Sequence, residues 1–414
     1  MEPRRPAERR SLARPATIGV VAVATLGILG FGYATGFGSS PEGSPKPVAV
    51  VTTSPSPSEA APSAPDASAS SEPTASPTPT ASPTATPVPT AVTVPAPLTG
   101  LPVSKTVAMR HPIAVMIDDL RAARPQSGLS SASVVWQAPA EGGIPRYMAI
   151  FAETVPKDVG PVRSSRYYFI AWAAEWKAAY AHAGGSPQAL KTLRAKGNGQ
   201  LVYNVDEFRW GGSFRRIKWK FPPHNLYTTG PQLRKLAKRV GATDQAMDAV
   251  WKFAPDAPLE ARPTGGSIMV KYLANTINYK YDRKSNTYLR SVTGESKQKD
   301  ESGGARIAPK NVIVMLMHFG PLNDGSKKHR LEAQVVGSGP AWISTNGKTI
   351  KGTWKKAGLT KPTQFFDKNG KQVTLTAGQT FVQVMPYGSA MAFKKGTMPA
   401  SASASPSPTP TPKP

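Results

Sequence analysis

The stretch PIAVMID, at residues 112–118, indicates a strand buried on both faces of a sheet, because it is a short apolar run bounded by polar and turn-forming residues. Two similar runs follow it, SVVWQA at 133–138 and RYMAIFAE at 146–153. Helical patterns come next, at 164–178, 188–195 and 232–240, and one further short strand lies at 180–183. This alternation predicts that residues 98–262 form a mixed α/β domain.

The second half of the body has a different pattern. Its segments are short and rich in β-branched and aromatic residues, and they lie at 268–272, 276–281, 287–292, 312–318, 349–354 and 381–385. Turn signals such as Asn346-Gly347 and Asn369-Gly370 separate them. We therefore expect a mostly antiparallel, β-rich domain at 263–397, and the fold class of the whole body is α/β (α+β).

The beginning of the chain carries a targeting signal. Residues 1–15 contain five arginines, and residues 16–37 form a run of 22 residues without a charge. A helix needs about 20 apolar residues to cross a bilayer, and basic residues before the span stay in the cytoplasm. This pattern predicts a single-pass signal-anchor in the cell membrane at 16–37, a cytoplasmic head at 1–15 and an extracytoplasmic body. A cleaved signal peptide is the alternative, although its apolar region is usually ~7–15 residues.

Two segments of low complexity flank the body. Residues 38–97 and 398–414 consist mainly of Pro, Ser, Thr and Ala, and such segments bury too little apolar surface to fold. We expect a disordered linker, acting as a spacer, and a disordered tail. The chain has no cysteine, which excludes disulfides, thiol catalysis, Cys-ligated zinc and a lipid on an N-terminal cysteine.

The charge of the chain is concentrated in the body. Residues 98–400 hold 44 basic and 19 acidic side chains, which is +25 of the total +26. A basic domain outside a membrane attracts anionic lipids or anionic wall polymers, whereas nucleic acid is supported by charge alone. General solubility without a dedicated partner is the alternative. The densest basic cluster surrounds Trp219, and it suits either a glycan or phosphate surface or a solvated loop.

Catalytic motifs in the chain are weak. Ser186 follows His182 closely enough to be a nucleophile with a histidine base, but Ser-Pro at the start of a helix is typical of an N-cap. Asp118 and Asp119 end the first strand, where they can hold a cation or act as acid and base, or cap the next turn. We predict no cofactor and no metal site, and we leave open whether the protein is an enzyme, with a non-catalytic role favoured.

The candidate site consists of polar residues beside glycine and proline at the ends of predicted elements. Such positions allow backbone N–H groups and guanidinium groups to converge on an anion. We predict an anion-binding or glycan-binding site formed by Arg124, Glu141, Arg146, Arg163, Arg166, His182, His224 and Asn225. The alternative is that the arginines pair internally with Glu141, Asp118 and Asp119.

A series of short sequence motifs, which follow one another along the chain, resembles the motifs of a known family. They include PLTGLPV at 97–103, IAVMIDD at 113–119, ARPQSGLSSA at 123–132, AEGGIPRYMAIF at 140–151, GPVRSSRYYF at 160–169, AHAGGSPQAL at 181–190, PHNLYT at 223–228 and, later, NVIVM at 311, GSGPAW at 337 and KGTW at 351. The chain resembles the YerB-like family of bacterial putative lipoproteins over about residues 97–387. The resemblance implies a two-part α/β body on the outer face of a bacterial membrane, but no activity. Family members are often anchored through a lipidated cysteine, which this chain lacks.

These observations together favour a non-catalytic envelope protein. Its expected partners are the bacterial membrane, through residues 16–37, and an anionic wall polymer, a glycan or an envelope protein. The alternative is a hydrolase or transferase that acts on wall material through Glu141, His182 or Asp118.

Overall fold

The structure, a computed structural model, describes residues 92–399. The predicted head at 1–15, the predicted membrane span at 16–37, the linker up to residue 91 and the tail from residue 400 lie outside the described residues. Within residues 92–399, no helix combines the length and the apolar character needed to span a membrane.

The described part begins with a small hairpin. β1 (Thr93–Pro95) pairs antiparallel with β2 (Pro102–Ser104), and α1 (Lys105–Ala108) follows. Ala96 is buried, and its N–H donates to the Leu101 carbonyl at 2.8 Å. The prediction of a disordered linker up to residue 97 is therefore wrong for residues 93–97, because this local pairing and burial order them.

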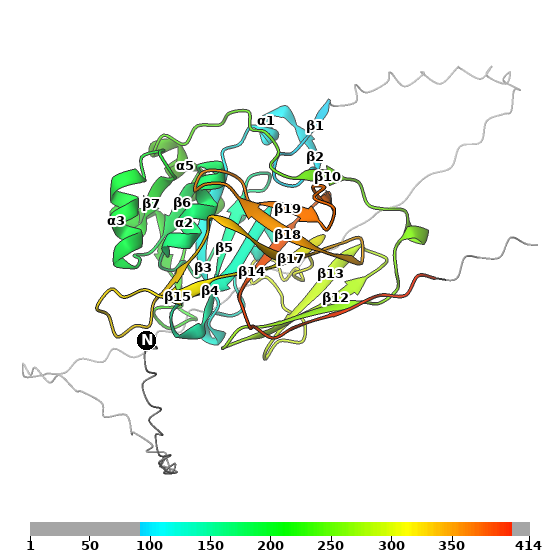
Figure 1. Cartoon of the computed structure of the whole chain (residues 1–414). Helices are drawn as coiled ribbons and strands as arrows, with labels where there is room; N and C mark the ends of the chain where they lie inside the picture. Colours follow the sequence, from blue (N-terminus) through cyan, green and yellow to red (C-terminus); the bar gives the residue numbers. More distant parts are fainter. Residues whose placement is uncertain (1–91, 400–414) are drawn as a thin grey trace, which may run out of the picture. The chain divides into compact units, whose positions relative to one another are not determined.

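A ten-stranded sheet forms the centre of the body (Figure 1). Its strand order is β19-β18-β17-β14-β21-β4-β5-β3-β6-β7. The first half of the chain supplies β3 (Ile113–Asp118), β4 (Val134–Pro139), β5 (Pro145–Phe151), β6 (Ala179–His182) and β7 (Tyr203–Asp206). The second half supplies β14 (Asn311–Met317), β17 (Gly337–Thr345), β18 (Lys348–Lys356), β19 (Gln364–Asp367) and β21 (Thr380–Pro386).

The two halves of the sequence meet inside this sheet. β21 lies between β14 and β4 and runs parallel to both. The pairs formed within the second half are mostly antiparallel, and β21 departs from this pattern, because its neighbours on both sides run in its own direction. Strands from both sides of residue 262 share this sheet. The domain boundary predicted there therefore remains a prediction.

Helices and a second sheet cover the two faces of the main sheet. α2 (Tyr167–Ala173), the 3-10 turn η4 (Ala174–Trp176) and α3 (Pro187–Lys196) pack on one face, where Trp172 stacks on Trp136 with ring centroids 4.9 Å apart. α5 (Gly230–Arg239) packs on the other face. A four-stranded sheet of order β13-β12-β11-β22 contacts the same sheet through β14 and β21. The predicted mixed class is confirmed: the body is α+β, with more strand than helix.

The remaining elements are short. The second sheet comprises β11 (Ser267–Lys271), β12 (Thr276–Asp282), β13 (Thr287–Val292) and β22 (Met391–Lys394). Three two-stranded pairs join β8 (Arg215–Arg216) to β9 (Leu226–Tyr227), β10 (Lys252–Ala254) to β20 (Thr374–Thr376), and β15 (Phe319–Pro321) to β16 (Leu331–Ala333). One more helical turn is α4 (Glu207–Trp210), and the other 3-10 turns are η1 (Arg121–Ala123), η2 (Leu129–Ser131), η3 (Glu141–Gly143), η5 (Gly211–Ser213) and η6 (Leu259–Ala261).

Local sequence signals explain where the longer helices begin. Ser186 caps α3, because its Oγ accepts a hydrogen bond from Ala189 N at 3.3 Å, and Pro187 occupies the first turn. Thr229 caps α5 in the same way through Gln232 N. The helix expected from residue 164 begins only at Tyr167, because Ser165 forms a β-bridge with Gly185 and keeps this segment extended.

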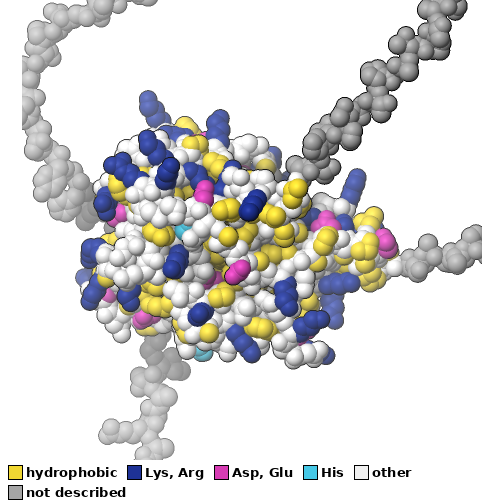
Figure 2. Space-filling model, turned by 90° about the horizontal axis from the view of Figure 1, so that it is seen from above, with side chains coloured by type: hydrophobic (Ala, Val, Ile, Leu, Met, Phe, Trp, Pro, Cys, Tyr) yellow, Lys and Arg dark blue, Asp and Glu magenta, His cyan; other side chains and the backbone are white. Residues whose placement is uncertain are grey.

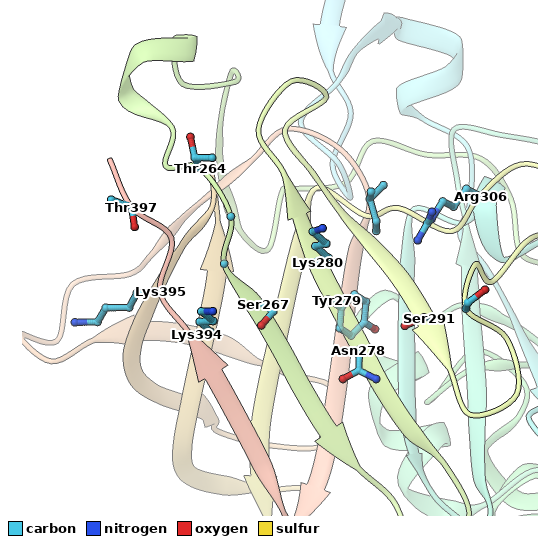
Figure 3. A pocket seen from close by; sticks show the side chains of 14 residues that line it. Thr264, Ser267, Asn278, Tyr279, Lys280, Ser291, Arg306, Lys394, Lys395 and Thr397 are labelled. Carbon is cyan, nitrogen blue, oxygen red and sulfur yellow. The ribbon is translucent and has the colours of Figure 1, made fainter. Parts of the chain in front are cut away.

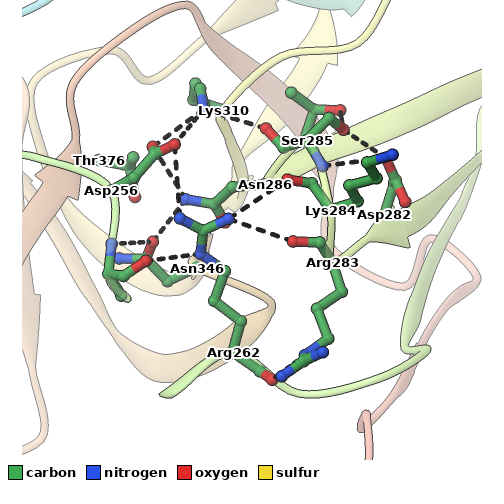
Figure 4. Close-up of polar contacts among 12 residues, drawn as sticks. Asp256, Arg262, Asp282, Arg283, Lys284, Ser285, Asn286, Lys310, Asn346 and Thr376 are labelled. Carbon is green, nitrogen blue, oxygen red and sulfur yellow. Dashed lines mark hydrogen bonds and ion pairs between the residues drawn. The ribbon is translucent and has the colours of Figure 1, made fainter. Parts of the chain in front are cut away.

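A polar network fixes the segment between the two halves of the sequence (Figure 4). Asp256 accepts hydrogen bonds from Lys310 Nζ at 2.8 and 2.9 Å and from Asn286 Nδ2 at 3.0 Å. Arg262 donates to the Arg283 carbonyl at 3.2 Å. Burial by itself would raise the pKa of Asp256, but the hydrogen bonds and the charges of Lys310 and Arg262 outweigh it and lower the pKa. The connecting segment is thus bound to the second sheet.

Candidate functional site

Six strands of the main sheet end at the same edge. β14, β21 and β4 are parallel neighbours, as are β3, β6 and β7. β5 is antiparallel to both β4 and β3, so the two groups run in one direction. We call the side where these strands end the carboxyl edge. In open α/β sheets, ligands bind in the crevice outside this edge.

Asp118 is the centre of the charged residues at the carboxyl edge. It is the last residue of β3, and its Oδ2 lies 2.8 Å from Arg163 Nε and 2.7 Å from His224 Nδ1. The Arg163 Nε–H is not aimed at the oxygen, so this contact is an ion pair without a hydrogen bond. The other oxygen, Oδ1, accepts from Leu120 N at 3.1 Å. Both oxygens of this nearly buried carboxylate therefore have partners within the protein.

Arg146 lies between Asp118 and Glu141, which is the first residue of the turn η3. It lies directly opposite Asp118 in the β3–β5 pairing, and its Nη1 donates to the Ser164 carbonyl at 2.8 Å. Its Nη2 is 3.8 Å from Glu141 Oε2, and Glu141 also accepts from Arg166 Nε at 2.9 Å. Burial lowers the pKa of Arg146, and the Asp118 carboxylate opposes this shift.

Together these residues form two neighbouring groups of ion pairs: Arg163 and His224 contact Asp118, and Arg146 and Arg166 contact Glu141. The pairing of β3 with β5 places Arg146 opposite Asp118 and so brings the two groups together. We call this set the carboxyl-edge cluster; it consists of His224, Asp118, Arg163, Arg146, Glu141 and Arg166. Burial also lowers the pKa of Arg163 and that of Arg166. The most exposed side chains of the cluster are Glu141 at 26%, Arg163 at 21% and His224 at 15%. Only these three can meet a ligand directly.

His182 lies outside this cluster, although it ends the neighbouring strand β6. Its Nδ1 contacts the Gly184 carbonyl at 2.9 Å, and its Nε2 contacts Asn204 Oδ1 of β7 at 2.8 Å. The ring is fully buried. Both nitrogens are therefore occupied, and Ser186 uses its hydroxyl as a helix cap, so this pair has no free base and no free nucleophile.

Two predicted site residues hold loops in place. Asn225 accepts from Arg216 Nη1 at 2.9 Å and donates to the Ile217 carbonyl at 3.2 Å. Arg124 donates to the Thr293 carbonyl of the second half at 2.7 Å and lies 3.4 Å from Asp119 Oδ1. Neither contacts the carboxyl-edge cluster. The structure thus brings six ionisable residues together and leaves Arg124, His182 and Asn225 apart from them.

A buried polar network beside Asp119 was not expected from the sequence. Gln137 Nε2 donates to Asp119 Oδ2 at 2.6 Å, and Gln137 Oε1 accepts from Arg290 Nη2 at 2.8 Å. Asn275 also donates to Asp119, at 3.1 Å. Burial raises the pKa of Asp119 to about 6, although Arg124 and Arg290 oppose the shift. The one signal in the sequence is Gln137, a polar residue within the apolar run at 133–138.

The described residues contain no group of three or more His, Cys, Asp or Glu side chains placed to hold a metal ion. The carboxyl-edge cluster offers guanidinium donors, one partly exposed carboxylate and one imidazole. These groups can bind an anion or a hydroxylated ligand by exchanging an internal ion pair for a contact with the ligand.

The fold and the cluster define a class of α+β protein in which two sequence domains share one main sheet, with paired arginines at its carboxyl edge. The chain belongs to the family described as "Protein of unknown function (DUF3048)": the N-terminal domain of that family matches residues 98–243, and its C-terminal domain matches residues 268–382. The resemblance to the YerB-like family is thereby confirmed.

Two comparisons extend this assignment. The chain is 33% identical over 309 residues to "Putative lipoprotein YerB" of Bacillus subtilis strain 168, an alignment that covers 73% of this chain and 89% of the relative. The crystal structure of the YerB protein from Bacillus subtilis matches with a TM-score of 0.65 and 29% identity, and the match covers 73% of this chain and 100% of that one.

Proposed function

We propose that this chain is an extracytoplasmic cell-envelope protein whose folded body binds an anionic or glycan component of the wall, or an envelope partner, without catalysing a reaction. The observation that carries this proposal is uncompensated positive charge. Residues 98–400 carry +25, and most of their lysines and arginines form no ion pair with another described residue. Figure 2 shows lysine and arginine side chains over the whole visible face, with few acidic ones among them.

The location outside the membrane rests on the sequence and on the name of the relative. A lipoprotein is held at a membrane surface by its lipid, and the relative from Bacillus subtilis carries the name "Putative lipoprotein YerB". This chain has no cysteine to carry such a lipid, so we assign the anchoring role to the uncharged run at 16–37. In this proposal the arginines at 1–15 stay in the cytoplasm.

We infer a non-catalytic role because two of the candidate catalytic residues, Glu141 and His182, already bind other groups of the protein. Glu141 pairs with Arg166 and Arg146, and both nitrogens of His182 have partners. A general base needs a free position within hydrogen-bonding reach of the substrate. The buried ring of His182 offers no such position, and the carboxylate of the partly exposed Glu141 is already held by two arginines.

Protease shaving of intact cells tests the topology. Protease added outside should remove the folded body from the membrane fraction, while a tag fused before residue 1 should stay protected. A body that resists digestion until the cells are lysed would contradict the proposal.

A wall-binding assay tests the carboxyl-edge cluster. Replacing Arg163 by Gln should weaken retention of the full chain on isolated cell walls by about tenfold, because a charge-assisted contact is lost. Arg215→Gln is the matched control, since Arg215 pairs with Asp158 and is 48% exposed. Equal retention of both variants, with a lower melting temperature for Arg163→Gln, would assign Arg163 to structure and remove it from the site.

A wall-acting enzyme is the second candidate, and one observation favours it. Asp118 holds His224 through Nδ1 at 2.7 Å, and His224 Nε2 forms no hydrogen bond with any residue in 92–399. A carboxylate that orients an imidazole in this way is the arrangement of a general base. Release of soluble fragments from purified walls by the wild-type chain, but not by His224→Gln, would support this candidate against the first.

A further inference from the structure

A second basic site lies on the outer face of the four-stranded sheet, away from the carboxyl-edge cluster. A cavity of about 550 Å³ opens there between β11, β12, β13 and β22 and the loop that leads to Arg306 (Figure 3). Cavities of this size are in the range that holds small ligands.

The charges that line this cavity all have one sign. Lys280, Lys394, Lys395 and Arg306 line it, and no aspartate or glutamate does. None of the four forms an ion pair with another residue of the described range. Arg306 Nε is buried and has no hydrogen-bond partner there. A concave surface lined by cations alone concentrates anions from solution.

The register of the sheet brings two of these cations to the same place. Ser267 of β11 pairs with Lys280 of β12 on one side and with Lys394 of β22 on the other. Side chains at paired positions lie on the same face of a sheet, and Figure 3 shows the three residues on adjacent strands. The two lysine backbones are thus two strand spacings apart, roughly 10 Å. Their flexible side chains can both reach one anion placed over Ser267.

Neutral donors complete the lining. Gly265 and Gly266 have positive φ angles of 72° and 97°, and their N–H groups donate to no other described residue. A Cβ atom at Gly265 would have no neighbour within 4 Å, so a ligand can approach this backbone. Successive free N–H groups in a turn bind anionic oxygens. Asn278 and Ser291 add an amide and a hydroxyl.

We propose that this cavity binds the phosphate group of a phosphate-bearing polyol or sugar chain. Lys280 and Lys394 hold the phosphate from two sides, Arg306 contributes a third cation, and the Gly265–Gly266 backbone supplies neutral donors. Lysine binds phosphate as a point charge and needs no fixed fork geometry, so two lysines on neighbouring strands can hold one phosphate group between them. Asn278 and Ser291 bind hydroxyl groups of the chain.

Binding of poly(glycerol phosphate) to the purified full-length chain, measured by titration calorimetry, tests this site. The double variant Lys280→Gln/Lys394→Gln should bind about 100-fold more weakly, at about tenfold for each charge-assisted contact. Lys348→Gln/Lys351→Gln is the matched control: both lysines are exposed on β18, the loss of charge is the same, and we expect less than about threefold change. Neutral dextran should not bind.

Three results would overturn the inference: no binding of the polymer by the wild-type chain, an equal loss in the control variant, or binding of phosphatidylglycerol vesicles without binding of the polymer. The wall-binding assay with Arg163→Gln, described under the proposed function, is a separate experiment. Wall retention that persists in Lys280→Gln/Lys394→Gln, together with unchanged polymer affinity, would leave the proposed function standing and reject this site alone.

Discussion

Lys356 of β18 donates to Glu175 of the turn η4 at 2.8 Å, and neither side chain has any exposed surface. Glu175 also accepts from the Thr363 hydroxyl and from Thr363 N, at 2.6 and 3.1 Å. Burial raises the pKa of Glu175 and lowers that of Lys356, and in each case the charge of the partner opposes the shift. This pair connects the first half of the sequence to the second inside the protein.

Lys356→Met should destabilise the protein by about 3–5 kcal/mol, because it leaves the Glu175 carboxylate buried without its cation. Lys348→Met, at the exposed start of the same strand, should change stability by no more than about 0.5 kcal/mol. Chemical denaturation of both variants measures the difference. The double variant Lys356→Met/Glu175→Leu should recover part of the loss, and a double variant no more stable than Lys356→Met would contradict a role for the unpaired charge.

Asp119→Asn should change how stability depends on pH. Burial raises the pKa of Asp119 from 3.8 to about 6, so the folded state binds more protons than the unfolded state between these two values. The contribution of Asp119 to stability therefore falls as the pH rises from about 4 to about 6, by up to about 3 kcal/mol. Above this window the contribution is constant.

Denaturation at a series of pH values from 4 to 7 measures this effect. The free energy of unfolding of Asp119→Asn, relative to that of the wild type, should rise across the window. Asp248→Asn controls for the change in net charge. A difference between Asp119→Asn and the wild type that is the same at pH 4 and pH 7 would show that Asp119 does not titrate in this range.

Gly352→Ala should destabilise the edge of the main sheet. A Cβ atom at Gly352 of β18 would overlap the Phe366 carbonyl oxygen of β19, which is backbone and cannot rotate away. We expect a loss of about 1–3 kcal/mol, seen as a lower melting temperature. Gly358→Ala is the control, because the nearest atom to its added Cβ is Lys361 Cγ at 3.6 Å, an ordinary contact. Similar melting temperatures for the two variants would refute this account.

Removal of residues 1–91 should leave the melting temperature of the body nearly unchanged, as expected for a spacer. A chain that begins at Leu98 should be less stable than one that begins at Val92. It lacks β1 and the buried Ala96, and with them the pairing to β2. Thermal unfolding of the two chains tests this, and equal melting temperatures would mean that the hairpin adds nothing to the fold.

Much of the local structure could be predicted from the sequence. The runs at 112–118, 133–138 and 146–153 became β3, β4 and β5, because short, mainly apolar runs fit a strand that is covered on both faces. Ser186 and Thr229 marked the starts of α3 and α5, because a cap bonds to N–H groups only a few residues away. The strand β17 was missed, since GSGPAW opens with residues typical of turns.

The candidate site was predicted less completely. The sequence indicated that arginines gather near element ends, and it left open whether they face a ligand or internal carboxylates. The structure pairs Arg163 with Asp118, and Arg146 and Arg166 with Glu141. It also leaves a second, unpaired group of cations around Ser267, which no motif marked, because its members come from two strands, β12 and β22, and from residues outside any strand.

The sequence by itself determined the properties that depend on neighbours along the chain: the family, the main strands and longer helices, the basic character of the body and the uncharged run at 16–37. Only the tertiary structure decided which strands share a sheet and which charges meet. β21 enters between β14 and β4, and Lys356 reaches Glu175 across 181 positions of the chain. Such contacts depend on the packing of distant segments against one another, which no local pattern of residues encodes.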